Sequence, residues 1–563
     1  QMCIRDSNTG SVEDIFIPIK SVYFALIDNN IVSIKKIAQS DSSIAQGIQS
    51  KFETRQDSVI SSVMNELTDS PTAYGQLSDE MKVYIYYIYK NVLVDNGIIN
   101  TDNMDTNDSV YVNWDENESI SLKELLTYAL TKNWIDMDKL TAEKYSSLQE
   151  AYDSLLEYIS NYISNDTGFG KKVYRYMISS GSISGWEVCM MLYEQGVLEP
   201  SGSAYEGLSS GRMSAYDFMI NAITEKTITP AQLALEPCSG SAVVADPDTG
   251  ELLALVSYPG YDNNRLSGTV DKDYYEQLRN DKAKPLINKA TSLRTAPGSI
   301  FKPCSAITGL EQGVISTGES IVCTGQYTAV TPSPKCWIYP RSHGAENVST
   351  AIRDSCNVFF YTVGHRLGME SGGTYNSTKG TDLLKNYAEQ LGLATKSGVE
   401  IYEMDPHPSD RDAVASAIGQ GTHAYSAINL CRYVSTLATS GVCHDFTLVS
   451  KITDYNGNVI RDNEPVVSNT MNVSSSTWNA VHQGMRLVIE NTASFKGLPY
   501  QAAGKSGTAQ ENTNKADHIT FISYAPYDNP EVAVSVLIPN GYASSNAAKL
   551  TSDIYKIYWG LDK

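Results

Sequence analysis

The N-terminal half of the chain has the pattern of apolar and polar positions that is typical of helices. Between residues 56 and 226, apolar side chains recur every three or four positions, as at Leu122, Leu125 and Leu126. This is the period of a helix that buries one face. Residues 214–224 predict a further short helix by the same pattern. Nothing in this half indicates chemistry, so we interpret it as a mainly helical scaffold.

Three stretches of the N-terminal half depart from this pattern. In residues 21–34, apolar side chains such as Val22 and Phe24 lie among polar ones in a way that predicts a strand. Residues 100–108 and 161–170 are rich in Asn and Asp, and such clusters are typical of loops. We therefore expect one strand and two loops here.

The pattern changes near Thr229. Residues 241–245 and 252–256 are short runs rich in apolar side chains, and the turn-forming segment 246–250 joins them, which predicts a β-hairpin. The region that follows is mainly helical. Three further strands and a closing helix are predicted at the C-terminal end, in residues 502–509, 518–524, 532–538 and 545–558.

Strands at both ends of a segment with helices between them indicate an α+β domain. The sequence therefore predicts an α+β multidomain protein. Its first part, residues 8–228, is mainly helical, and its second part, residues 229–563, has a central antiparallel sheet flanked by helices. Residues 1–7 resemble an assembly artefact, and we leave them out of the fold prediction.

The charge of the chain excludes one class of partner. The chain has 563 residues with 64 acidic and 43 basic side chains, a net charge of −21, and it contains no run of basic residues. A nucleic acid would be repelled by such a surface. We therefore expect no nucleic-acid partner.

The nine cysteines form no CxxC pair, and no Cys/His cluster has the spacing of zinc ligands. We therefore predict no metal site, and nothing in the sequence indicates a cofactor. Cys323 and Cys336 flank a loop rich in Thr and Pro. They could form a disulfide in an oxidising compartment or remain two free thiols, and the sequence leaves both open.

The most informative segment runs from Thr295 to Pro303. Pro303 is tolerated only near the start of a helix, so the helix should begin close to Ser299, and Ser299 and Lys302 should share one face of it. Ser299 is then a candidate nucleophile at a helix N-terminus, which favours an anionic intermediate. Lys302 can remove its proton only if the lysine is neutral, so its pKa must be lowered.

Lys505 is the candidate for lowering that pKa. Two like charges about 4 Å apart, at an effective dielectric constant of about 20, repel by about 4 kcal/mol, or about three pKa units. Lys505 is followed by Ser506, Gly507 and Thr508. The small residues would let a substrate backbone approach, and the lysine with two hydroxyls would bind a carboxylate.

A third candidate element is Ser355-Cys356-Asn357, within the helical pattern of residues 348–368. The Ser355 hydroxyl could relay a proton, and the Asn357 amide can both donate and accept a hydrogen bond. Each of these motifs alone is weak. Ser33 and Lys36 also fit S-x-x-K, but they lie in the stretch predicted as a strand, so we do not assign them a role.

Together the three motifs resemble the penicillin-binding proteins and serine β-lactamases. Ser299-x-x-Lys302, Ser355-x-Asn357 and Lys505-Ser506-Gly507 occur in the order used by those families. The resemblance extends over residues 229–560, in which further segments are similar to a penicillin-binding transpeptidase domain: residues 258–262, 297–303, 336–337, 343–344, 418–421 and 521–526.

The resemblance implies a serine acyltransferase that cross-links peptidoglycan. Ser299 would attack the carbonyl between the two terminal D-alanines of a stem peptide, with Lys302 as the general base. Ser355 would pass a proton to the leaving amine, and Asn357 would hold the substrate amide. β-Lactams would acylate Ser299 and stall there.

The same resemblance assigns the C-terminal motif to substrate binding. Lys505, Ser506 and Thr508 would bind the terminal carboxylate beside Gly507. The backbone N–H groups of Ser299 and Thr508 would form the oxyanion hole. Ser506 stands where Thr is more common in the family, which is a mild variation.

The N-terminal half resembles the pedestal of class B penicillin-binding proteins, which lack a glycosyltransferase. The resemblance implies an extracytoplasmic protein that works with a glycosyltransferase or with divisome or elongasome partners. No run approaches the roughly 20 apolar residues that span a bilayer. Because the chain begins with Gln1, we expect the natural start and a membrane anchor to lie upstream.

Two other functions stay open on the sequence. A serine β-lactamase would need a base that activates water, and no E-x-x-L-N segment lies between Ser355 and Lys505. A non-catalytic β-lactam sensor or wall-synthesis scaffold would be acylated without transferring the acyl group. A carboxypeptidase that uses water as the acceptor also stays open.

Overall fold

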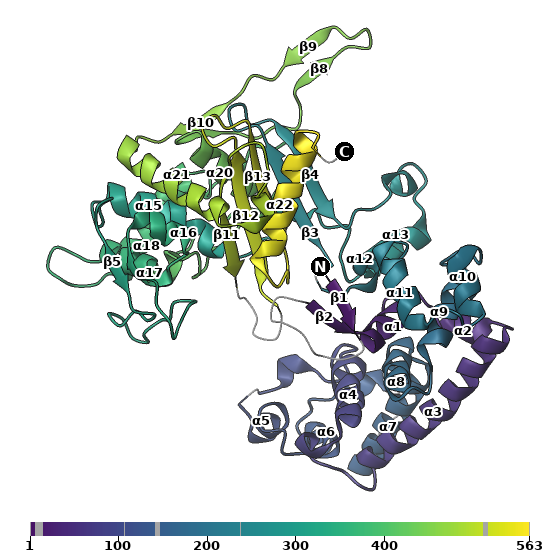
Figure 1. The fold of residues 1–563 in the computed structure, drawn as a ribbon. Coiled ribbons are helices and arrows are strands. Elements are labelled where there is room, and N and C mark those ends of the chain that lie inside the picture. Colours follow the sequence, from purple (N-terminus) through teal and green to yellow (C-terminus); the bar gives the residue numbers. More distant parts are fainter. Residues whose placement is uncertain are drawn as a thin grey trace. The chain divides into compact units, whose positions relative to one another are not determined.

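The computed structural model describes residues 2–5, 15–105, 107–140, 147–236, 238–509 and 516–561 (Figure 1). Apart from the first fifteen residues, the chain divides into two compact units, Phe16–Leu233 and Ala234–Lys563. We call them the helical unit and the α+β unit. Residues 8–14, at the start of the predicted N-terminal domain, lie outside the described residues.

The helical unit confirms the helical pattern of the N-terminal half. Many of its helices begin at a serine, asparagine or aspartate whose side chain accepts a hydrogen bond from the first turn, and Ser121 and Ser184 form full capping boxes. A two-stranded sheet of β1 (Met2–Arg5) and β2 (Ile15–Pro18) precedes the helices. The helical elements are α1 Ile19–Asp28, α2 Ile34–Gln39, α3 Ser43–Leu67, η1 Tyr74–Gln76, α4 Asp79–Tyr87, η2 Ile88–Val94, η3 Thr101–Asn103, α5 Ser109–Asp115, α6 Leu122–Thr131, η4 Met137–Lys139, α7 Leu148–Asn165, α8 Thr167–Ser180, α9 Gly185–Glu194, α10 Gly202–Ser209, α11 Ala215–Thr224 and α12 Pro230–Leu233.

The predicted strand in residues 21–34 is wrong, because this stretch contains the helix α1 and the start of α2. The buried positions of α1 follow the three- and four-residue period of a helix, and the alternation of apolar and polar side chains that suggested a strand covers only part of it. Its buried side chains include Ile19, Val22, Tyr23, Leu26 and Ile27.

One of the two predicted loops is also wrong. Residues 161–170 belong to α7 and α8, which meet at Asp166. The carboxylate of Asp166 accepts a hydrogen bond of 2.7 Å from the backbone N–H of Phe169, so the polar cluster marks a helix cap rather than a loop. Residues 100–108 do form a loop with one short 3-10 turn, although residue 106 is not described.

The α+β unit is built on a five-stranded antiparallel sheet in the order β11-β12-β13-β3-β4. The predicted hairpin and the three C-terminal strands are confirmed. Because β3 pairs with β13, with Ala242 opposite Val536, the sheet joins the start of the unit to its end. The strands are β3 Gly240–Ala245, β4 Leu252–Tyr258, β11 Ala503–Ala509, β12 His518–Ala525 and β13 Val532–Ile538.

Helices cover both faces of this sheet (Figure 1). On one face, Val243, Ile522 and Ala533 pack into a large core with the helices between the two strand groups, including α20. On the other face, their neighbours Val244 and Phe521 pack against α22, the closing helix. The helical elements are η5 Asn263–Leu266, α13 Lys272–Asn280, α14 Lys289–Ser292, η6 Gly298–Phe301, α15 Lys302–Glu311, α16 Val348–Arg353, α17 Asn357–Leu367, α18 Ser377–Gln390, α19 Ala413–Ser416, α20 Ala427–Ala438, α21 Ser475–Glu490, η7 Ala493–Phe495 and α22 Ser544–Tyr558.

Besides the pair β1 and β2, the described residues contain six short strands outside the main sheet, in three two-stranded ladders. They are β5 Ile321–Cys323 with β6 Gly344–Glu346, β7 Val442–His444 with β10 Val467–Thr470, and β8 Lys451–Thr453 with β9 Val459–Asp462. In the described part of the chain, no helix is both long enough and apolar enough to cross a bilayer.

Candidate active site

Ser299 lies in a tight turn at the start of α15. Residues Gly298–Phe301 form the 3-10 turn η6, and α15 continues from Lys302 with Pro303 in its first turn. The prediction that a helix begins close to Ser299 is therefore confirmed. Gly298 donates a backbone hydrogen bond of 3.0 Å to the carbonyl of Gly419, which ties the turn to the segment 418–421.

Lys302 is fully buried one turn after Ser299. Its Nζ donates to the carbonyl oxygen of Ser355 at 2.6 Å, to Ser355 Oγ at 3.0 Å and to Asn357 Oδ1 at 2.7 Å. The first two sequence motifs are thus joined directly by three hydrogen bonds.

Ser355 departs from the expected continuous helix over residues 348–368. The chain forms α16 up to Arg353 and starts α17 at Asn357, and between them Ser355 has a φ of 53°. A non-glycine residue in this left-handed region costs about 1 to 2 kcal/mol. The break turns both oxygens of Ser355 toward Lys302, and a regular helix would not do so.

Lys505 reaches the same hydroxyl from the sheet. It lies on β11, the edge strand, and is 1% exposed. Its Nζ donates to Ser355 Oγ at 3.2 Å and to the carbonyl oxygen of Ser506 at 3.0 Å. Two lysine side chains that are far apart in the sequence therefore meet at one serine hydroxyl.

Burial lowers the pKa of both lysines, and the charge of Lys302 lowers that of Lys505 further. Burial lowers the pKa of Lys302 to about 7. The pKa of Lys505 is well below its usual range, first because the side chain is buried and then because the charge of Lys302 is close. The sequence argument assigned the lowering at Lys302 to repulsion by Lys505, whereas in the structure burial is what lowers the pKa of Lys302.

The other residues of the C-terminal motif pack their backbone against the turn that carries Ser299. A Cβ on Gly507 would lie 2.6 Å from the carbonyl oxygen of Pro297, and one on Gly298 would collide with the carbonyl of Thr508. Ser506 is half-buried and the side chain of Thr508 is exposed. The strand thus lies directly beside Ser299 and leaves the Thr508 hydroxyl accessible.

A comparison with protein families matches residues 240–556 to the penicillin-binding protein transpeptidase domain. The match covers more than half of the chain. This chain belongs to the penicillin-binding protein transpeptidase family.

Known members of the transpeptidase family are similar at low identity. The peptidoglycan D,D-transpeptidase MrdA of Haemophilus influenzae is 29% identical over 362 residues, which are 58% of this chain and 53% of MrdA. The chain therefore spans about half the length of the curated relatives that it matches. Transpeptidase-family structures that resemble it include Pseudomonas aeruginosa PBP2 in complex with WCK 5153, at 26% identity and a TM-score of 0.50 over 57% of this chain and 70% of that one.

A second solved structure is a chain of a peptidoglycan synthase complex that coordinates polymerization and crosslinking. It is 26% identical with a TM-score of 0.51, over 58% of this chain and 56% of that chain. These similarities place the α+β unit in the transpeptidase family by fold as well as by sequence.

Gly298→Ala should damage the site of this transpeptidase-family member more than an equivalent change elsewhere. Gly298 and Gly313 both have positive φ angles, 56° and 66°, but a Cβ at Gly313 meets nothing within 4 Å. Both alanines should cost about 1 to 2 kcal/mol in backbone strain. Only Gly298→Ala should also slow labelling by a fluorescent penicillin, by about tenfold or more, because the turn must move away from Thr508. Equal labelling rates in the two variants would contradict this packing.

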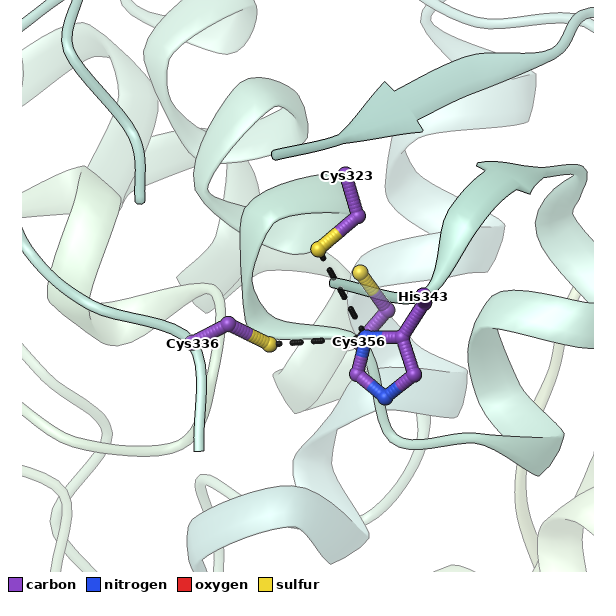
Figure 2. Close-up of side chains that lie close together, drawn as sticks. All are labelled: Cys323, Cys336, His343 and Cys356. Atoms are coloured by element: carbon purple, nitrogen blue, oxygen red, sulfur yellow. Dashed lines mark hydrogen bonds between the residues drawn. The ribbon is translucent and has the colours of Figure 1, made fainter. Parts of the chain in front are cut away.

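Figure 2 shows a group of four side chains that spacing alone did not reveal, one of which, Cys356, follows Ser355 directly in the sequence. The ligand atoms of Cys323, Cys336, His343 and Cys356 all lie within 4.8 Å of one another. Both Cys323 and Cys336 have free thiols, so of the two possibilities that the sequence left open, the structure has the free thiols. The cysteines are too irregularly spaced to match a zinc-binding motif, and only the fold brings them together.

The competing S-x-x-K segment has a structural role. Ser33 precedes α2 as its N-cap, and its hydroxyl accepts a hydrogen bond of 3.4 Å from the backbone N–H of Lys36. It belongs to the helical unit. Ser33 therefore provides a matched control for Ser299.

Proposed function

We propose that this protein is a peptidoglycan D,D-transpeptidase that forms an acyl-enzyme on Ser299. The observation that carries the proposal is that Lys302, one turn after Ser299, and Lys505 both donate to Ser355 Oγ, and that both lysines are buried. A member of the transpeptidase family with this arrangement has a base and a proton relay in direct contact, and a candidate nucleophile one turn before the base.

The two buried lysines together carry one ammonium group and one neutral amine in this proposal. Both pKa values are lowered, so a second proton on the pair is disfavoured near neutral pH. The carboxylate of a stem peptide beside Lys505 would favour the ammonium form there. Lys302 would then be neutral and able to accept the proton of Ser299.

The first half of the reaction breaks an amide and forms an ester. Ser299 Oγ attacks the carbonyl carbon between the two terminal D-alanines while its proton passes to Lys302. The backbone N–H groups of Ser299 and Thr508 stabilise the resulting oxyanion. Ser355 passes a proton to the leaving amine and takes up the proton held by Lys302, to which it is hydrogen-bonded. The terminal D-alanine departs, and the acyl group stays on Ser299.

Substrate binding in this proposal uses β11. Its outer edge has no partner strand among those that the structure describes, so an extended stem peptide can pair with it. Asn357 would hold the substrate amide. Lys505, Ser506 and Thr508 would bind the terminal carboxylate, with Gly507 allowing close approach.

The second half of the reaction forms the cross-link. The amine of a neighbouring stem peptide attacks the ester carbon and Ser299 regains its proton. A β-lactam would acylate the same oxygen. We infer that the protein acts outside the cytoplasmic membrane, where its substrate lies, and together with a glycosyltransferase, a pairing that the similarity to a peptidoglycan synthase chain supports.

Transpeptidation is tested with a thioester donor that mimics the stem peptide and a D-amino acid as the acceptor. We expect a product that joins the donor acyl group to the D-amino acid, and its amount should rise with acceptor concentration. The hydrolysed donor alone would indicate a carboxypeptidase. A stable penicillin adduct without transfer would indicate a sensor or scaffold, and rapid penicillin turnover a β-lactamase.

A further inference from the structure

The four clustered side chains come from separate segments that a short ladder and an isolated β-bridge bring together. Cys323 ends β5, which pairs with β6 so that Cys323 lies opposite Gly344, next to His343. Cys336 donates its backbone N–H to the carbonyl of Gly325 at 2.9 Å. Cys356 precedes α17 as its N-cap residue. The fold thus directs four side chains from four backbone positions toward one point.

The distances within this group are those of a tetrahedral metal site. His343 Nδ1 lies 3.5 Å from Cys323 Sγ and 3.6 Å from Cys336 Sγ, and Figure 2 shows both sulfur atoms directed at this nitrogen. Zinc bonds of about 2.3 Å to sulfur and about 2.0 Å to nitrogen place tetrahedral ligand atoms about 3.5 to 3.8 Å apart. The side chains therefore need little movement to bind an ion.

The donor atoms also select the metal. Three thiolates and one imidazole form a soft set with a charge of −3, which suits Zn²⁺ and excludes Mg²⁺ and Ca²⁺. The three cysteines are buried, with exposures of 0 to 2%. Five other cysteines of the described residues are also buried and free, but none of them belongs to such a group. Buried cysteines often serve only as small apolar side chains in a core. That role does not explain why three thiols and an imidazole gather around one point.

Two of these ligands are tied to the Ser355–Asn357 turn. Cys356 is its central residue, and Cys336 Sγ accepts a hydrogen bond of 3.3 Å from the backbone N–H of Asn357. The turn contains the strained Ser355 and provides all three hydrogen-bond acceptors of Lys302. Strain of this kind persists only where the surroundings fix the backbone.

We propose that Cys323, Cys336, His343 and Cys356 bind one Zn²⁺, and that this site holds Ser355 and Asn357 in position for acylation. Cys336 and Cys356 are then positioning residues, because they touch the turn and not the reacting atoms. The metal site itself stands on geometry alone, whereas the positioning role rests on the proposed function.

Metal content tests the site independently of activity. The full chain is purified under reducing conditions, incubated with Zn²⁺, freed of excess metal and measured by elemental analysis. We expect about one Zn²⁺ per chain, and a thiolate-to-metal absorption band after replacement by Co²⁺. Cys323→Ser should remove most of the metal, because it deletes a ligand that lies outside the Ser355–Asn357 turn.

Cys443→Ser is the matched control. Cys443 is also buried and free, in β7, and does not belong to the group. This variant should retain about one Zn²⁺ per chain. A wild-type chain that takes up no Zn²⁺, or equal metal content in Cys323→Ser and Cys443→Ser, would overturn the site.

The positioning role is tested by the rate of penicillin acylation before and after metal removal with a chelator. Removal should slow acylation about 10- to 100-fold, and Zn²⁺ should restore it. Unchanged acylation by the metal-free chain would overturn the positioning role. Ser299→Ala separates the two proposals, since it should bind a full equivalent of Zn²⁺ whether or not Ser299 is the nucleophile.

Discussion

Ser299→Ala should eliminate covalent labelling of the protein by penicillin. Without the hydroxyl no ester can form, so we expect the acylation rate to fall by about 10⁴-fold or more. Intact-mass measurement over time checks this directly. The wild type should gain the mass of one penicillin, and the variant should gain none. Ser299 is only half-buried, so stability should change little.

Ser33→Ala is the control that the chain itself offers. Ser33 has the same S-x-x-K spacing, but its hydroxyl caps α2 in the helical unit. This change should cost about 1 kcal/mol of stability through the lost cap and leave labelling unchanged. An adduct that persists in Ser299→Ala, or disappears in Ser33→Ala, would show that the nucleophile is another residue.

The sequence was sufficient to predict the elements whose pattern is determined locally. The hairpin of β3 and β4 has a strong turn between two apolar runs, and the three C-terminal strands are separated by turn residues, so both groups were predicted correctly. Helix α1 was not, although its buried side chains have helical spacing, because the stretch interpreted as a strand began inside the helix and continued past its end at Asp28.

The parts of the candidate site that could be predicted are those whose geometry follows from a short sequence motif. Ser299 and Lys302 lie one turn apart where η6 leads into α15, because they are three positions apart and Pro303 follows. The left-handed Ser355 was missed, since its conformation depends on contacts with Lys302 from a distant segment. The cysteine group was missed for the same reason: tertiary pairing of β5 with β6, and not spacing, brings Cys323 to His343.

Acylation should depend on pH through Lys302. Burial lowers the pKa of this lysine to about 7, and only the neutral amine can accept the proton of Ser299. The acylation rate should therefore rise with pH up to about 7 and level off above it, falling about tenfold per unit well below the pKa. Penicillin keeps its carboxylate ionised over this range, so the profile reports the enzyme.

Lys302→Met should slow acylation strongly and remove its pH dependence near pH 7. Methionine fills a similar volume without an amine, and loss of the base should slow acylation by about 10²- to 10⁴-fold. Lys171→Met is the control: burial also lowers the pKa of Lys171, but it lies in the helical unit and donates to the carbonyl of Asp28. The Lys171→Met variant should be acylated with the wild-type pH profile. A Lys302→Met variant that still shows a rise near pH 7 would mean that another group is the base.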